Sequence, residues 1–538
     1  MQKKPFLLLL ITFFLAPLSR FFSIDDVLAQ QTPAHHVCGI SEQDSRIIYN
    51  SMMEARQRNP NPAPMRAVAY VPVWFHLVAN SDGTGRVPMN KILDMLCELN
   101  RLYSSNSIEL QFYIKGINNL NNSSLYTSPR SFGGDNAIRA NKKNDGVNIY
   151  MVSNANDPAQ PNATVLGYYL NTGNGLPYEA DWLVVINSQA SIGGAVTLAH
   201  ELGHFFSLPH TFLGWESCPF QPTSANPCAP ATISCFGGGV YTVENAARTG
   251  TDANCSTAGD GFCDTPPDYN LGFYATSCTY NGLASDPKCV KIDPEEKNIM
   301  SYFTGCETSF SAMQKTAIQN NYLTHTNRGY LRVGNIAPTV TTLDAVNPTS
   351  PILGATTQYY NNFTLTWDAV TGATGYVVEI SKTATFLDSR IFVATTNSIN
   401  INNAMAPNYF LTAGQNYFWR VKPYNNYVSC AAVSARQAFV AGLVNATQEI
   451  AEVTSFEVAP NPLSKTQPLQ LHLTTEKAFD AQVKLFNVAG KQILSEKRHF
   501  DQGFSSQSLS ISDIAAGLYI LSIESEKGVL NKKVVINP

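Results

Sequence analysis

Three histidines and a glutamate occur close together in the chain, at a spacing that suits metal chemistry. His200 and His204 are four residues apart, so on a helix their imidazoles would share one face and could reach one metal ion. Glu201 would project beside that ion, where it could polarise a bound water instead of binding the metal. His210 can join only if the chain turns after the helix, and Pro209 is consistent with a turn. Three nitrogen ligands leave a fourth position open for water, which is typical of catalytic zinc sites.

The alternative to a metal site is that these histidines only pack in the protein core or cap a helix. A bare His-Glu-x-x-His pattern also arises by chance in long chains, but a third histidine six residues further on favours a metal site. On the zinc hypothesis, the metal lowers the pKa of its water and polarises the scissile carbonyl. Glu201 takes the proton of the zinc-bound water and passes it to the leaving amine. The predicted cofactor is therefore Zn²⁺, and the predicted reaction is peptide-bond hydrolysis.

Four motifs in this chain resemble those of the metzincin metallopeptidases, and among these the pappalysin (cytophagalysin) branch. They are the zinc segment 200–212, an early strand at 71–78, an Asp-rich loop at 259–267 and a Met-turn at 298–302. The motifs occur in the family's order and cover about residues 65–330. The resemblance implies a secreted zinc metalloendopeptidase that cleaves extracellular proteins and is made as a latent zymogen.

The resemblance also implies roles for residues of the Met-turn. Met300 would form a hydrophobic floor under the histidines, and Tyr302 would donate a hydrogen bond to the tetrahedral oxyanion. An ordinary packed tyrosine is the alternative for Tyr302. One position departs from the family pattern, because Ser207 stands where the family usually has glycine. If that residue needs a positive φ, serine costs on the order of 1 kcal/mol.

Several aspartates crowd the loop that follows the zinc segment. Hard oxygen ligands on a flexible loop suit calcium, and the pappalysin-like enzymes carry calcium near this loop. Asp260 and Thr265 match that site, and Asp252 is a further candidate ligand. The alternative is that these aspartates only form turns. A structural Ca²⁺ is therefore a second predicted cofactor.

The cysteines suggest both disulfides and a latency device. Eight of the 11 cysteines are clustered between residues 218 and 306 without any Cys-x-x-Cys pair, which favours disulfides over a zinc ribbon. Cys38 lies before the catalytic region, and its thiolate could fill the fourth zinc position and keep the enzyme latent. A disulfide between Cys38 and Cys97 is the alternative.

The chain is expected to be multidomain, with an α/β (α+β) metzincin-like catalytic domain followed by two all-β sandwich domains. Strands are expected at 71–78 and 181–186 and a helix at 89–102, whereas alternating strands from about residue 334 predict the sandwiches. The predicted boundaries are a signal peptide at 1–29, a propeptide at 30–62, the peptidase domain at 63–333, a module resembling fibronectin type III at 334–445, and a C-terminal domain at 453–538.

The C-terminal segment resembles the sorting domain of the bacterial type IX secretion pathway. The resemblance rests on residues 459–462, 485–490, 516–519 and 532–535, and an ordinary small sandwich is the alternative. It implies that the type IX machinery is a partner and that a Gram-negative-type bacterium exports the protein through the periplasm. No apolar run after the signal peptide is long enough to span a membrane, so no transmembrane segment is expected in the mature form.

Composition excludes one class of partner. The formal net charge is −4, and no Lys/Arg cluster reverses it locally, so nucleic-acid binding is not expected. Protein or peptide substrates remain the predicted partners. A different class of function is a non-catalytic surface adhesin or binding protein on a degenerate peptidase scaffold. Against this alternative, His200, Glu201, His204 and His210 are all present.

Overall fold

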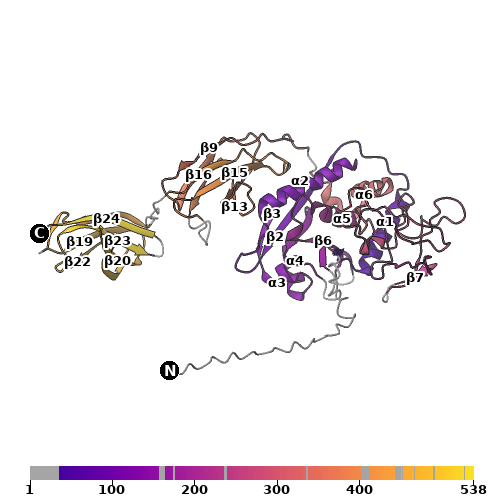
Figure 1. Ribbon diagram of the computed structural model, residues 1–538, viewed down its shortest axis with the longest axis horizontal. Helices are drawn as coiled ribbons and strands as arrows, with labels where there is room; N and C mark the ends of the chain where they lie inside the picture. Colours follow the sequence, from indigo (N-terminus) through magenta and orange to yellow (C-terminus); the bar gives the residue numbers. More distant parts are fainter. Residues whose placement is uncertain are drawn as a thin grey trace, which may run out of the picture. The chain divides into compact units, whose positions relative to one another are not determined.

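The computed structural model describes two compact units. The first comprises Met1–Asp344, Val370–Val377 and Pro423–Ala432, and the second comprises the remaining segments to Pro538 (Figure 1). The predicted signal peptide at 1–29 and the first residues of the propeptide lie outside the described residues. The described residues are 36–156, 164–173, 176–235, 239–334, 337–402, 411–442, 450, 452–465, 467–488, 491–525 and 528–537.

A six-stranded sheet forms the centre of the first unit, in the order β1-β5-β6-β4-β2-β3. Its neighbouring strands are parallel except β5 and β6, which are antiparallel. The predicted strands at 71–78 and 181–186 are confirmed within β2 and β6. The strands are β1 (His36–Cys38), β2 (Ala69–Ala79), β3 (Leu110–Asn121), β4 (Val147–Val152), β5 (Thr164–Gly173) and β6 (Leu176–Ile186).

Helices pack on this sheet through apolar faces. The predicted helix at 89–102 is confirmed as α2 (Met89–Ser105), which buries Ile92, Leu96 and Leu99 at helical spacing. Helix α2 contacts β3 and the helix α5 (Ala195–Phe205), and α5 in turn contacts β5 and β6. The remaining helices are α1 (Glu42–Arg58), α3 (Ser123–Thr127), α4 (Phe132–Asn141) and α6 (Ala312–Thr324), with short 3₁₀ turns η2 (Asn187–Gln189), η3 (Leu271–Tyr274) and η4 (Thr326–Leu331).

The long segment between α5 and α6 is mostly loop, and disulfides hold it together. Within it, the only paired strands in its described part are the short β7 (Thr232–Ile233) and β8 (Tyr241–Thr242). The prediction that the eight clustered cysteines form disulfides is confirmed. Cys97 pairs with Cys430 in the same unit, so it is not available to Cys38, which is free. The four clustered pairs are Cys218–Cys235, Cys228–Cys289, Cys255–Cys263 and Cys278–Cys306.

Residues 345–440 supply two β-sheets, as their alternating pattern predicts. The sheet orders are β10-β16-β15-β12-β13 and β14-β11-β9. The buried side chains of Trp367 and Trp419 lie with ring centroids 6.5 Å apart. The strands are β9 (Pro348–Ser350), β10 (Ala355–Thr356), β11 (Asn362–Trp367), β12 (Gly375–Ser381), β13 (Ser389–Ala394), β14 (Ser398–Asn402), β15 (Asn416–Tyr424) and β16 (Gln437–Val440).

The C-terminal residues form another pair of sheets, in the orders β17-β19-β22 and β18-β24-β23-β20-β21. Alternate residues of β19 and β20 point into a shared apolar core, which is the pattern of a two-sheet sandwich. The strands are β17 (Val453–Ala459), β18 (Leu463–Ser464), β19 (Leu469–Thr475), β20 (Phe479–Asn487), β21 (Gln492–Phe500), β22 (Gly503–Leu509), β23 (Gly517–Ser525) and β24 (Gly528–Asn537).

A buried ion pair connects the sheet to the end of α5. Arg328 is 1% exposed and binds Asp181 through Nη2 and Nε, at 2.6 and 3.3 Å. The same guanidinium donates to the hydroxyl of Tyr169 and to the carbonyl of Phe205, the last residue of α5. Burial opposes ionisation of Asp181, but the charge and hydrogen bonds of Arg328 hold the pKa of Asp181 below its usual value. The pair therefore fixes the C-terminal end of α5 relative to β5 and β6.

Replacement of Arg328 should destabilise the first unit strongly. Arg328→Met leaves Asp181 buried without its counter-charge, which we expect to cost about 3–5 kcal/mol of unfolding free energy. The pair Arg101–Glu98, in which the Arg101 side chain is 64% exposed, gives the control, because Arg101→Met should cost less than about 1 kcal/mol. Denaturant unfolding measures both values. Equal losses in the two variants would contradict the role assigned to Arg328.

Candidate metal centre and active site

The imidazoles of His200, His204 and His210 converge on one point. Nε2 of His204 lies 3.1 Å from Nε2 of His200 and 3.2 Å from Nε2 of His210. His200 and His204 are one turn apart on α5, as the sequence predicts. His210 comes from the segment after the helix. All three side chains are buried.

A sharp turn brings His210 back to the helix, and it begins at Ser207. The backbone of Ser207 has φ +67°, so this position does need the left-handed conformation that glycine adopts most easily. The backbone N–H of Leu208 donates to the carbonyl of Gly203, which closes the turn. The hydroxyl of Ser207 accepts a hydrogen bond from Asn321 at 2.7 Å and lies 3.2 Å from the hydroxyl of Ser51. These contacts offset part of the backbone cost of serine.

The protonation of the histidines follows from the partners of their Nδ1 atoms. Nδ1 of His200 lies 2.7 Å from the carbonyl oxygen of Ile299, and Nδ1 of His204 lies 2.8 Å from that of Leu208. Because a carbonyl oxygen can only accept, each Nδ1 carries the proton. Burial lowers the pKa of His200 to about 4, so its ring is neutral near pH 7. Burial and the nearby histidines lower the pKa of His204 and of His210 well below the usual value.

This arrangement fits a metal ion and is unfavourable without one. Neutral rings protonated on Nδ1 present lone pairs at Nε2, and no hydrogen is available to be shared between them. Two nitrogens bound tetrahedrally to one zinc at 2.0–2.1 Å are about 3.3 Å apart, close to the spacing in this site. Nitrogen ligands suit zinc better than the hard cations calcium and magnesium. The three histidines therefore fit a zinc ion.

Glu201 follows His200 on α5 and lines the same cleft. It is buried, and its pKa is raised to about 8 by burial, offset in part by hydrogen bonds from the Cys38 thiol and the Tyr169 backbone. Gly167 makes room for it, because a Cβ there would lie 3.2 Å from Oε1 of Glu201. A buried carboxylate with a raised pKa suits a group that accepts and returns a proton.

The turn at 298–302, the predicted Met-turn, lies against the histidines, because the carbonyl of Ile299 accepts from Nδ1 of His200. Met300 is fully buried, and a Cβ on Gly203 of α5 would lie 2.3 Å from its sulfur, so α5 approaches Met300 closely because residue 203 is glycine. The carbonyl of Met300 accepts from the N–H of Thr211, next to His210. Tyr302 lies beside His210, with ring centroids 5.1 Å apart. The turn thus contacts both the helix and the segment of the third histidine.

Cys38 occupies the open side of the histidine cluster. Its sulfur and one ring nitrogen of each of the three histidines all lie within 4.8 Å of one another. The thiol donates to Oε2 of Glu201 at 3.4 Å. The hydroxyl of Tyr302 accepts from the backbone N–H of Cys38 at 3.0 Å and lies 3.3 Å from its carbonyl oxygen. One residue of the predicted propeptide therefore lies beside the three histidines and hydrogen-bonds with both Glu201 and Tyr302.

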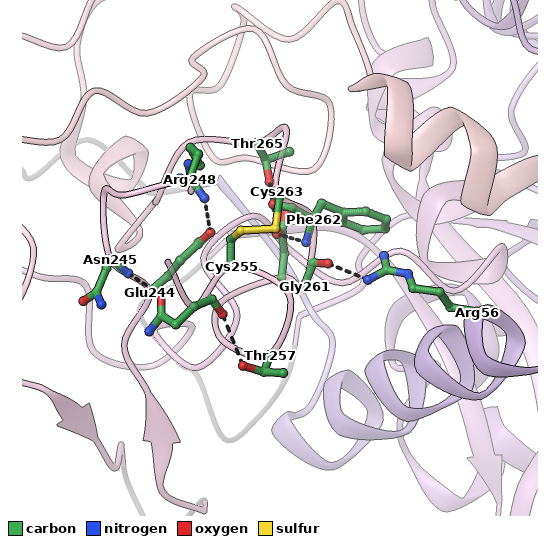
Figure 2. The surroundings of a disulfide bond; sticks show 12 residues. Arg56, Glu244, Asn245, Arg248, Cys255, Thr257, Gly261, Phe262, Cys263 and Thr265 are labelled. Carbon is green, nitrogen blue, oxygen red and sulfur yellow. Dashed lines mark hydrogen bonds and ion pairs between the residues drawn. A yellow bond between two sulfur atoms is a disulfide. The ribbon is translucent and has the colours of Figure 1, made fainter. Parts of the chain in front are cut away.

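The rest of the described propeptide is held by its own contacts. Strand β1 pairs in parallel with β5, and helix α1, which the sequence did not predict, follows it. Arg56 near the end of α1 donates to the carbonyl of Gly261 at 2.7 Å and lies over the ring of Phe262, as Figure 2 shows. The segment 59–68 after α1 has no helix or strand and is mostly exposed. Exposed backbone without regular structure is where proteases cleave most readily.

Two of the three predicted calcium ligands lie together in the disulfide-bonded loop. The hydroxyl of Thr265 donates to the carboxylate of Asp260, which is fully buried. Burial raises the pKa of Asp260 to about 8. Glu244 is buried beside Asp260. It pairs with Arg248, and Figure 2 shows this ion pair. Asp252 lies apart from them, largely exposed and 3.8 Å from Lys288.

Two glutamates near the site were missed by the sequence analysis. Oε1 of Glu216 lies 3.4 Å from Nδ1 of His210. Glu307 lines the same cleft as His200, Glu201 and Tyr302. Burial raises the pKa of each glutamate to about 7. The signal for Glu216 was its position soon after a predicted zinc ligand, since ligating histidines commonly donate to carboxylates.

Comparison with known proteins agrees with these findings at a coarse level. Residues 457–537 match the profile of the secretion system C-terminal sorting domain, the tail read by type IX secretion. The chain is 26% identical over 235 residues to an extracellular metalloprotease of Neurospora crassa, covering 41% of this chain and 72% of that protein. It is 25% identical over 272 residues to an extracellular metalloprotease of Sordaria macrospora, which covers 48% of this chain and 76% of that protein. This is a secreted or cell-surface protein.

The solved structures that this chain resembles match it with low identity and low TM-scores. Fibronectin(III)-like modules of Clostridium thermocellum CbhA match at 13% identity and TM-score 0.14, over 36% of this chain and 92% of theirs. The structure named FN3tt mut matches at 13% identity with a TM-score of 0.14, and the match covers 19% of this chain and 98% of that one. These TM-scores are too low to support an argument about the fold. No described helix is both long and apolar enough to cross a membrane.

Proposed function

We propose that this protein is a secreted zinc metalloendopeptidase of the pappalysin-like metzincin type. The observation that carries the proposal is the convergence of three Nε2 lone pairs beside a buried glutamate. The similarity to extracellular metalloproteases supports it independently. The substrates we propose are peptide bonds of extracellular proteins, since this protein is itself exported.

We assign each residue of the site a separate role in hydrolysis. His200, His204 and His210 would hold zinc, which when bound supplies Lewis-acid polarisation of a carbonyl and acidifies water. Glu201 accepts the proton of the attacking water and returns it to the leaving nitrogen. Tyr302 donates from its hydroxyl to the oxygen on which negative charge develops. Met300 supports the histidines from below and takes no part in proton transfer.

Removal of the Glu201 carboxylate should separate metal binding from catalysis. In Glu201→Ala the three histidines are intact, so zinc content should remain at the wild-type level. Loss of the general base should reduce casein cleavage by at least about 100-fold. Both proteins are first treated with trypsin to open the exposed segment 59–68. Wild type with 1,10-phenanthroline gives the metal-free control, and full activity of the variant would rule out the mechanism.

We also propose that the precursor is latent because Cys38 occupies the fourth zinc position. The contacts of Cys38 with Glu201 and Tyr302 support this, since the same residue would withhold the metal, the base and the oxyanion donor from substrate. Cys38 is free because Cys97 pairs with Cys430. Release of the propeptide would then be required before substrate can enter.

X-ray absorption at the zinc edge tests the role of Cys38. The uncleaved precursor, kept intact by Glu201→Gln, should show one sulfur ligand at about 2.3 Å together with nitrogen ligands. The same precursor with Cys38→Ser should lose the sulfur contribution. A spectrum of the Cys38-containing precursor without any sulfur ligand would show that the thiol is not the switch.

A structural calcium ion near Asp260 and Thr265 is a further part of the proposal. Two buried carboxylates, those of Asp260 and Glu244, lie near each other. Arg248 pairs with Glu244, and none of the described salt bridges includes Asp260. Like charges in such a place are costly unless a proton or a cation neutralises them. Oxygen ligands of this kind suit calcium.

Calcium should therefore raise the melting temperature of the protein. At a calcium concentration 100-fold above Kd, binding stabilises the folded state by about 2.7 kcal/mol. Asp260→Asn should remove this response, whereas Asp252→Asn reports whether the exposed Asp252 contributes a ligand. Calorimetry of calcium-stripped protein with and without added calcium gives the comparison. An unchanged melting temperature in the wild type would exclude the site.

A further inference from the structure

The three histidines of the cluster differ in the hydrogen-bond partner of Nδ1. His200 and His204 each donate to a backbone carbonyl, at 2.7 and 2.8 Å. Nδ1 of His210 instead faces a side-chain carboxylate, Oε1 of Glu216, at 3.4 Å. His210 also belongs to the segment beyond α5, so the helix itself does not hold its ring in place.

The carboxylate of Glu216 is held in position. Its Oε2 accepts from the backbone N–H of Gly214 at 2.7 Å, which directs Oε1 toward the imidazole. The side chain is 12% exposed, so bulk water competes little for the contact. On its face, the His210 ring stacks on Phe212, with centroids 4.6 Å apart and an interplanar angle of 10°. Ring and carboxylate are thus both fixed by the short segment 210–216.

We propose that Glu216 is a positioning residue that orients His210 as a zinc ligand. A carboxylate that accepts from Nδ1–H fixes the tautomer with its lone pair at Nε2 and makes that nitrogen a stronger donor. Glu216 therefore acts on the affinity for zinc and on the occupancy of the site. It does not touch the substrate or the attacking water. The proposal rests on the zinc site of the proposed function.

The chain contains a matched control for this residue. Glu307 also lies at the site, and its Oε2 accepts from the backbone N–H two residues earlier, that of Gly305, at 2.7 Å. This is the same local hydrogen bond, at the same distance, as that between Glu216 and Gly214. The described hydrogen bonds of Glu307 include none to a histidine of the cluster. Replacement of Glu307 therefore reports the loss of a buried carboxylate without the loss of a contact to a ligand.

The test measures zinc affinity in the full-length protein by competition with a chromophoric chelator. Glu216→Gln and Glu307→Gln are compared with wild type, and Glu216→Met serves as a second variant without any oxygen acceptor. We expect Glu216→Gln and Glu216→Met to bind zinc about 10–100-fold more weakly, with Glu307→Gln within about 2-fold of wild type. Without zinc, the melting temperature of Glu216→Gln should stay close to the wild-type value, because the amide oxygen can still accept from the Gly214 N–H, whereas Glu216→Met loses that hydrogen bond and should melt somewhat lower.

Kinetics of the trypsin-activated protein give a second readout. With limiting zinc, the Glu216 variants should lose kcat while KM stays unchanged, and excess zinc should restore kcat. A purely structural role would not give this pattern. Wild-type zinc affinity in both Glu216 variants would overturn the proposal, and so would an equal loss in Glu307→Gln. These results differ from failure of the proposed function itself, in which the wild type would bind no zinc.

Discussion

The central constraint on the first unit is that it holds together three neutral imidazoles whose lone pairs point at one another, which is an unfavourable arrangement. Hydrogen bonds from Nδ1 of His200 and His204 to backbone carbonyls keep those lone pairs at Nε2, at spacings of 3.1 and 3.2 Å. Burial lowers the pKa of the rings and keeps protons away. A cation removes the repulsion, and so these contacts make sense as a preorganised metal site.

Elements far apart in the sequence supply the parts that this arrangement needs. Helix α5 brings two histidines, the turn at Ser207 brings the third, and the turn at 298–302 accepts from His200 and carries Tyr302. Arg328 fixes the carbonyl of Phe205 at the end of α5. The disulfide-bonded loop and α6 in turn receive helix α1 of the propeptide. The segment predicted to be a propeptide thus packs on the same unit that holds the histidines.

The sequence predicted the parts of the site whose chemistry depends on local spacing. The two helical histidines, the turn before His210 and the strands at 71–78 and 181–186 all follow from periodicity or from short motifs. The pairing of Cys97 with Cys430, helix α1 and the contact of Glu216 with His210 did not. The disulfide depends on how distant segments meet, and the Glu216 contact depends on a loop conformation, although the position of Glu216 six residues after His210 was a local signal. Helix α1 also had a local signal that was missed, because Ser41 caps it by accepting from the N–H of Asp44. The Glu216 contact also depends on a hydrogen bond to Gly214, which only the loop conformation provides.

The most direct test is anomalous X-ray diffraction from crystals of the purified precursor, collected above and below the zinc absorption edge. The account predicts one strong anomalous peak within bonding distance of Nε2 of His200, His204 and His210, which disappears below the edge. The absence of a peak at this position, with the three histidines arranged as described and zinc present in the crystal solution, would contradict a zinc site there.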